Sequence, residues 1–496
     1  MKNKLFISAM LLVLLSACNL DIQPVSDQSE LNLSTKDTTD QRIKYKDRAA
    51  MEAVYKNLYQ LMRDRQEHWY LDYLLFCETR SDNAYAGSNG NEILPVENNS
   101  LDASNPDIAR DWDRYLEDIA AANVVITNID AVPDKAFSKA EREQWKAEAK
   151  IFRSMMIFDM ARWWGNIPLN LSEAPDITAD NVTEVYPLYF PMPSTQEQAY
   201  NQVINDLTEA IPYAPALNPG DKTLLSKTVA YATLARVYAE LGDWQQVVDY
   251  CNKIQADGIR LEPDFRTLWK FDKETKDVTR NSCEVILEMQ YNSGSGNWVS
   301  WMFGRDYNDP EYSFTWAKWI TPSRDIMAAF DAVGDTVRRN QSIVYEACSW
   351  SNYYPAEHYP FMYKCRSGLN SIIKLRGADF ILLKAEALAH LGQDADALSL
   401  VNQTRQRVGL APLMGLTGES LMDAILNERR LELAFEGSRF FDLIRFGKLL
   451  PVMNTLNSRD EGRVPQARPF VENHRLMPIP QTALDQNVNL QQNPGY

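Results

Sequence analysis

"NERRLELAFEGSRFFDLIRFG", residues 427–447, combines charged and large apolar side chains in one short stretch. Three of its acidic residues recur at every fourth position, on one face of a helix: Glu428, Glu432 and Glu436. Arg429 and Arg430 lie within reach of acidic residues three or four positions away. Because Arg and Glu at helical spacing usually form ion pairs between helices, we interpret the stretch as scaffold and not as a catalytic cluster.

The stretch predicts two consecutive helices. The first has Thr417 as its N-cap and Gly437 as its C-cap, since Thr favours the start of a helix and Gly its end. The second helix follows with five large apolar residues: Phe440, Phe441, Leu443, Ile444 and Phe446. These apolar faces need other helices to pack against, so the stretch predicts a fold of packed helical pairs.

Further helical pairs have the spacing of a tetratricopeptide hairpin, a repeat of two antiparallel helices. Residues 228–254 show this spacing with Gly242-Asp243 as the turn, and residues 378–410 repeat it. A third pair has an insertion between its two helices, at 141–169 and 196–211, and a fourth contains residues 427–447.

We therefore predict a mainly α protein, built as a tetratricopeptide-like scaffold of helical hairpins with long, loop-rich insertions. The hairpins fall within about 141–256 and 378–450. The largest insertion, about 257–376, is rich in Trp, Tyr, Gly, Ser and Asn and has little helical period. Loops on a helical scaffold often carry function, so we expect the ligand-binding face in this insertion.

Trp298 and Trp301 are the first candidate ligand-binding residues. They follow the turn sequence Ser293–Asn297, which should lift side chains into solvent. An exposed indole combines an apolar face with a polar edge and can stack on a sugar ring. Three other aromatic residues lie at i, i+4 and i+7, a spacing more typical of a core helix: Tyr312, Trp316 and Trp319.

A second candidate group lies in the polar segment "CETRSDNAYAGSNGN", residues 77–91. Arg80, Asp82, Asn83 and Tyr85 supply hydrogen-bond donors, acceptors and a ring. The segment fits a hydrogen-bonding rim for a polyol, and it fits a capped surface turn equally well.

The N-terminus predicts export and lipidation. Residues 1–17 have a basic start and an apolar run typical of a signal peptide, and Leu15–Cys18 matches the bacterial lipobox, so Cys18 is the expected lipidation site. Residues 18–40 are polar and predict a tether, and we expect 41–496 to form one helical domain.

Composition and motifs exclude several function classes. The net charge of −16 disfavours binding to nucleic acid. His68, His358, His390 and His474 are far apart, and the chain has no zinc motif, calcium loop, phosphate-binding glycine loop or nucleophile elbow. We therefore expect no metal and no cofactor. The 67 acidic residues leave a catalytic carboxylate pair open, but none stands out in the sequence, and we expect a protein that is not an enzyme. Five cysteines besides Cys18 do not form a disulfide framework, although Cys348 and Cys365 could close a loop.

Several motifs together resemble the SusD/RagB family of outer-membrane nutrient-binding lipoproteins. They are the lipobox at Cys18 and the segments 147–169, 234–244, 382–410, 427–449 and 474–496, the last ending in Gln-Asn-Pro-Gly-Tyr. The resemblance spans nearly the whole mature chain.

The resemblance implies a lipid-anchored protein at the cell surface, in the outer membrane. Such a protein captures a polysaccharide or oligosaccharide for a SusC-like TonB-dependent transporter, with its loops holding the ligand and its hairpins docked on the transporter. Alternatives are a peptide-binding RagB-like lipoprotein, a surface glycoside hydrolase and a helical-repeat assembly factor. The shared motifs are structural, so they assign no ligand residues, no particular glycan and no role for calcium.

Overall fold

Helices form most of the computed structural model, which describes residues 44–87, 90, 92–308 and 319–496. The predicted signal peptide, Cys18 and the tether 18–40 lie outside the described residues, as do Tyr312 and Trp316. The helices of the main body are α3 (Arg48–Asp64), α4 (Asp72–Thr79), α6 (Pro106–Asn128), α7 (Lys139–Trp164), α9 (Gln196–Ala210), α10 (Lys227–Leu241), α11 (Trp244–Ala256), α15 (Gly377–His390), α16 (Asp394–Arg407), α17 (Gly418–Glu432) and α18 (Arg439–Arg445). The mainly α prediction is confirmed.

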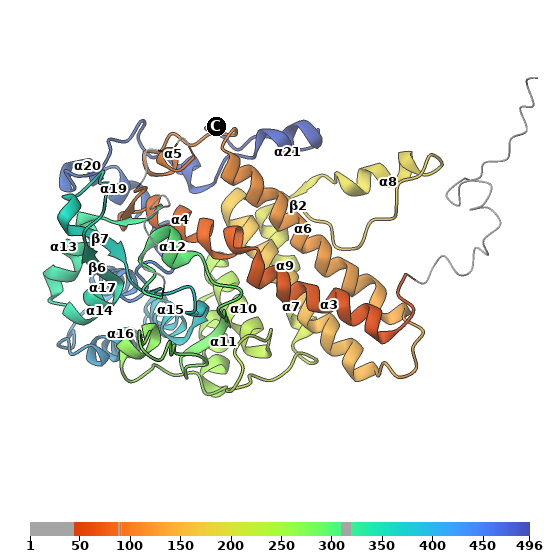
Figure 1. The fold of residues 1–496 in the computed structure, drawn as a ribbon, viewed down its shortest axis with the longest axis horizontal. Helices are drawn as coiled ribbons and strands as arrows, with labels where there is room; N and C mark the ends of the chain where they lie inside the picture. The colour runs from red at the N-terminus through yellow and green to blue at the C-terminus, as the bar shows by residue number, and fades with distance from the viewer. Residues whose placement is uncertain (1–43, 88–89, 91, 309–318) are drawn as a thin grey trace, which may run out of the picture.

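Short elements fill the insertions between these helices. Further helices are α5 (Leu94–Glu97), α8 (Val182–Tyr189), α12 (Val299–Phe303), α13 (Arg324–Val333), α14 (Thr336–Ser342), α19 (Leu449–Met453), α20 (Leu456–Arg459) and α21 (Gln481–Gln486). The strands form antiparallel pairs: β1 (Ala84–Tyr85) with β5 (Thr321–Pro322), β2 (Ile167–Pro168) with β3 (Pro193–Ser194), β4 (Val285–Met289) with β8 (Ile372–Arg376), and β6 (Ile343–Glu346) with β7 (Tyr359–Met362). Figure 1 shows the long helices α3, α6 and α7 on one side and β6, β7, α13 and α14 on the other.

The predicted hairpins are present. Helices α10 and α11 pack against each other, as do α15 and α16, and α7 packs on α9 despite the insertion between them. Gly242 ends α10 in the left-handed conformation, with φ of +74°, and its N–H donates to carbonyls of the last turn. The start of α7 is fixed by Ser138, whose side chain accepts from the N–H of Glu141. One connected core cluster extends from Met51 to Leu490.

The prediction that Gly437 caps the first helix of the opening stretch is wrong. Thr417 is the N-cap as predicted, but α17 ends at Glu432. The chain then turns through Phe435 and Gly437, which both have positive φ. Glycine is needed at 437 for a second reason, because a Cβ there would lie 2.7 Å from the ring of Tyr73.

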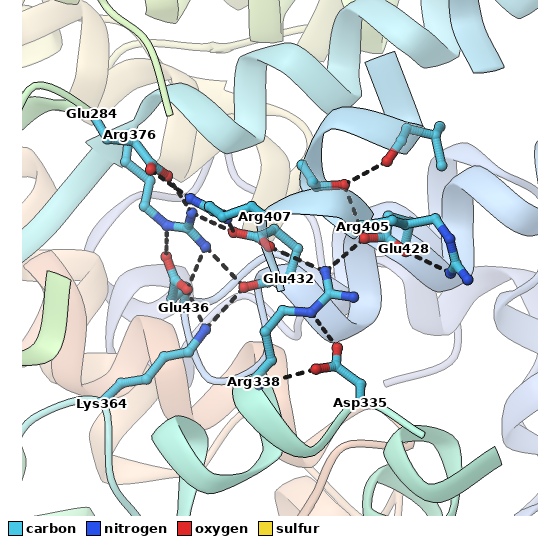
Figure 2. A network of polar contacts seen from close by, with 12 residues as sticks. Glu284, Asp335, Arg338, Lys364, Arg376, Arg405, Arg407, Glu428, Glu432 and Glu436 are labelled. Atoms are coloured by element: carbon cyan, nitrogen blue, oxygen red, sulfur yellow. Dashed lines mark hydrogen bonds and ion pairs between the residues drawn. The ribbon is translucent and has the colours of Figure 1, made fainter. Parts of the chain in front are cut away.

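The charged residues of the opening stretch form a buried network between elements (Figure 2). Glu432 is fully buried and lies 2.7 Å from Arg376 of β8 and 3.1 Å from Arg338 of α14, and it also pairs with Arg407 of α16. Glu428 pairs with Arg338 at 2.6 Å and with Arg405 at 3.3 Å. The scaffold interpretation therefore matches the observed contacts.

Two arginines of the stretch, Arg429 and Arg430, pair with distant elements and not along their own helix. Arg429 contacts Asp379 at 2.8 Å and Asp442 at 2.9 Å. Arg430 contacts Asp325 at 2.6 Å. Arg429 and Arg430 were predicted to reach acidic residues three or four positions away, and this prediction is wrong. Each side chain points toward a neighbouring element and does not lie along the surface of its own helix.

Candidate functional site

Trp298 stands at the start of the short helix α12 with 39% of its surface exposed. It follows a turn in which the Asn292 side chain accepts from the N–H of Gly294 at 2.9 Å. Asn and Gly favour such turns, so the local sequence explains why the chain reverses here. The predicted exposure of Trp298 matches its position in the structure.

One buried glutamine, Gln66, fixes the backbone at Trp298 and just before it. The Trp298 N–H donates to Oε1 of Gln66 at 2.8 Å, and Nε2 of Gln66 donates to the Gly296 carbonyl at 3.1 Å. Asn297 adds a second attachment, since its buried side chain donates to the carbonyls of Ser367 and Asn370. The exposed indole therefore projects from a loop that is held by hydrogen bonds to two other segments.

Trp301 lies one turn further along α12 and is half-buried. Its side chain packs against the main core cluster, in contrast to that of Trp298. Trp319 is also half-buried against this core, in agreement with its prediction as a core residue, and its N–H donates to the Met302 carbonyl at 3.1 Å. Trp298 thus offers more ring surface to a ligand than Trp301 does.

Further aromatic rings lie beside this loop. Tyr307 and Tyr363 meet edge to face with ring centroids 5.8 Å apart, and the Arg366 guanidinium lies 4.0 Å from the Tyr363 ring. On the β6–β7 hairpin, Tyr345 stacks on the exposed His358 at 4.2 Å. The Tyr307 N–H donates to the Arg366 carbonyl, so the loops around residues 298 and 366 are joined. We call residues 291–308 and 345–368, where described, the aromatic face.

Arg80, Asp82, Asn83 and Tyr85 do not form a rim in the structure. All four are at most 2% exposed, and each forms hydrogen bonds to other parts of the protein. Arg80 donates to the His474 carbonyl at 2.7 Å, and the Tyr85 hydroxyl donates to Asp460 at 2.6 Å. The prediction of a solvent-facing rim is corrected here, because side chains this buried leave no surface for a ligand.

Asp82 is the centre of this buried junction. It accepts two hydrogen bonds from Arg439 at 2.7 and 2.9 Å and lies 3.2 Å from Arg430. Burial alone would raise its pKa, but the charges of Arg430 and Arg439 hold the pKa of this carboxyl well below its usual range. Asn83 completes the junction, with its amide donating to Glu78 and its carbonyl accepting from Arg430. Asp82 is therefore an ionised structural anchor.

The histidine, cysteine and acidic side chains offer few further sites. Among the described residues, no group of three or more His, Cys, Asp or Glu side chains could hold a metal ion. His68 is buried against Asp118 at 2.9 Å. In the described part of the chain, no disulfide joins Cys348 to Cys365, and none involves Cys77, Cys251 or Cys283.

Two family models match the chain. The model described as "SusD family" matches residues 359–496, and the one described as "Starch-binding associating with outer membrane" matches residues 29–239. The chain is similar to the SusD family in both of these segments. It is 26% identical over 502 residues to SusD-like protein P2 of Formosa agariphila. The alignment covers 91% of this chain and 93% of that relative.

Solved SusD structures share the fold. A laminarin-binding SusD-like protein superposes with a TM-score of 0.72 at 22% identity, covering 91% of this chain and 100% of that one. Surface glycan-binding protein A of Bacteroides thetaiotaomicron, solved with laminarihexaose, gives a TM-score of 0.71 at 18% identity over 90% of this chain and 99% of its own. The resemblance to SusD proteins seen in the sequence is confirmed by the two family models and the SusD-like relative, and the solved structures confirm the shared fold.

Proposed function

We propose that this SusD-like protein is a non-catalytic surface lipoprotein that binds a polysaccharide or oligosaccharide and passes it to a SusC-like TonB-dependent transporter. The exposed Trp298 ring on its fixed loop is the observation that carries the binding role. Two solved proteins of the same fold support a sugar ligand, since one is described as laminarin-binding and the other is in complex with laminarihexaose.

The geometry favours stacking of a sugar ring on Trp298. An indole face covers the apolar face of a pyranose, while nearby polar groups bind hydroxyls. Asn292 and Ser293 are exposed in the same loop and provide amide and hydroxyl groups. Because Gln66 and Asn297 already hold the loop, binding loses less conformational entropy than it would on a free loop.

Attachment to the outer membrane is part of the proposal. The family description includes association with that membrane. Cys18 in its lipobox is the proposed lipidation site, and lipid chains on it would tether the protein to the membrane. No helix in the described ranges 44–308 and 319–496, gaps excepted, is long and apolar enough to cross a bilayer.

The test is calorimetric titration of the full chain in detergent with laminarin, other polysaccharides and a parallel set of peptides. We expect saturable heat with a glycan and no release of reducing ends. Trp298→Ala should weaken that binding about tenfold, which corresponds to about 1.4 kcal/mol, with an unchanged melting temperature.

Tyr213→Ala is the matched control, because Tyr213 is also exposed but lies outside the aromatic face. Full glycan affinity in both Trp298→Ala and Trp301→Ala would remove this site. Heat from peptides alone would favour the RagB-like alternative, and release of reducing sugar would favour the glycoside hydrolase.

A further inference from the structure

A cleft of about 390 Å³ lies where the helical scaffold meets the C-terminal segment of the chain. Helices α7, α9, α10 and α18 contribute to it, together with residues 472–494. Its walls include Arg162, Tyr200, Glu240, Phe441, Ile444 and Leu476. None of these residues belongs to the aromatic face, and the volume is in the range of sites that hold small molecules.

Several polar groups in the cleft have unused hydrogen-bonding capacity. Arg162 is 7% exposed and donates to Asp159 at 2.6 Å and to the Tyr73 hydroxyl, but its Nε–H is buried without a partner. Among the described residues, the Glu240 carboxylate accepts no hydrogen bond, since its ion pair with Nη1 of Arg162 spans 3.9 Å. The buried Tyr200 hydroxyl also bonds to no residue in this part of the chain. Buried polar groups are normally paired, so this set indicates a place for a polar ligand.

Glu240 differs from the buried carboxylates of the scaffold. Glu432 pairs with three arginines, whereas Arg162 is the one cation within 4 Å of Glu240 among the described residues. Burial raises the pKa of Glu240, and the charges of Arg162 and Arg445 oppose this effect only in part. Hydrogen bonds from a ligand would therefore stabilise this carboxylate.

The charges of the lining favour a neutral ligand. Two carboxylates, Glu240 and Glu472, are matched by two guanidinium groups, Arg162 and Arg475, so neither an anion nor a cation gains net attraction. The apolar part of the lining consists of Phe441, Ile444, Leu476 and Pro494. A neutral sugar fits this combination, because its ring has an apolar face and its hydroxyls both donate and accept.

The walls of the cleft are fixed by hydrogen bonds that leave these polar groups free. Nδ2 of Asn493 donates to the carbonyls of Trp164 at 3.0 Å and Met477 at 2.7 Å, which holds the C-terminal segment against the end of α7. Nε2 of Gln196 donates to the Ala161 carbonyl at 2.8 Å and ties the start of α9 to the same helix end. A ligand therefore enters a formed site and loses little free energy in ordering it.

We propose that this cleft is a second carbohydrate site, which takes one neutral sugar unit as a free monosaccharide or as the end of a glycan chain. Glu240 accepts hydrogen bonds from the sugar hydroxyls, Arg162 and Tyr200 donate to its oxygens, and the apolar wall covers the ring. The inference goes beyond the proposed function, because the cleft shares no residue with the aromatic face and either site can be lost without the other.

The experiment measures sugar binding to the full chain by saturation-transfer NMR titration, in a detergent without a sugar head group. One arm uses glucose, galactose, mannose and xylose, and the other uses laminarihexaose. All variants carry Trp298→Ala, which removes the exposed ring of the aromatic face, and the test variants add Tyr200→Phe or Glu240→Gln. The matched controls add Tyr213→Phe or Glu197→Gln, since both residues are exposed and neither lines the cleft.

At least one sugar should bind the Trp298→Ala protein, with affinity about fivefold weaker after Tyr200→Phe and about tenfold weaker after Glu240→Gln. The controls should keep the affinity of Trp298→Ala, and all melting temperatures should agree. Binding of monosaccharides would identify a free sugar as the ligand, and binding of laminarihexaose alone would identify a chain end. If no sugar binds Trp298→Ala, or if the test variants bind as the controls do, the cleft site is overturned and the site at Trp298 is unaffected.

Discussion

At the scale of single residues, the buried charges of α17 give residues 427–447 their structural role. Glu432 is surrounded by three arginines from three other elements, Arg338, Arg376 and Arg407. Burial opposes ionisation of Glu432, but these arginines hold its pKa well below the usual range. Removing one partner from a buried ion cluster leaves uncompensated charge, which costs more than the pairs themselves contribute.

Glu432→Gln should therefore destabilise the protein by about 3–5 kcal/mol, measured as the loss of unfolding free energy in denaturant titration. Glu419→Gln is its control on the same helix, since the Glu419 side chain is 85% exposed and its pair with Lys448 should contribute less than about 1 kcal/mol. Similar losses in the two variants would contradict the role of the buried network.

At the scale of elements, local sequence patterns predicted the helices and turns, but they did not predict contacts between segments far apart in the chain. The hairpins at 228–254 and 378–410 were predictable because apolar periodicity and the turn at Gly242 are local signals. The Trp298 turn was predictable for the same reason. Burial of residues 80–85 was not, because their partners Arg430 and Arg439 lie about 350 positions away and no sequence spacing reports that approach.

The turns at Gly242 and Gly437 differ in how much space surrounds the glycine. Gly437→Ala should destabilise the protein more than Gly242→Ala, although both glycines have positive φ. A Cβ at 242 meets no atom within 4 Å, so only left-handed strain of about 1–2 kcal/mol applies. A Cβ at 437 also overlaps the Tyr73 ring, which adds about 1–3 kcal/mol. Thermal unfolding of both variants measures the difference, and equal shifts would show that the ring moves aside freely.

At the scale of the whole molecule, stability should respond to pH through Glu78. This buried carboxylate accepts from the Gly437 N–H at 2.9 Å and from Asn83, so it joins segments far apart in the chain. Burial raises its pKa from 4.5 to about 7. A raised folded pKa means that the folded state binds the proton more tightly. Proton binding by Glu78 therefore stabilises the folded state fully below pH 4.5, and this contribution is lost as the pH rises through 7.

The Glu78→Gln variant tests this linkage by comparison with wild type at pH 5 and pH 8. Its unfolding free energy relative to wild type should increase between these values, by an amount on the order of 3 kcal/mol at most. Parallel pH profiles of the two proteins would show that Glu78 does not titrate between pH 5 and 8.

The junction around Asp82 also sets an order of events during synthesis. Its arginine partners are made some 350 residues later, so an emerging chain carries this carboxylate without the guanidinium groups that neutralise it. The junction around Asp82 is therefore completed only when the last helices of the chain have been made.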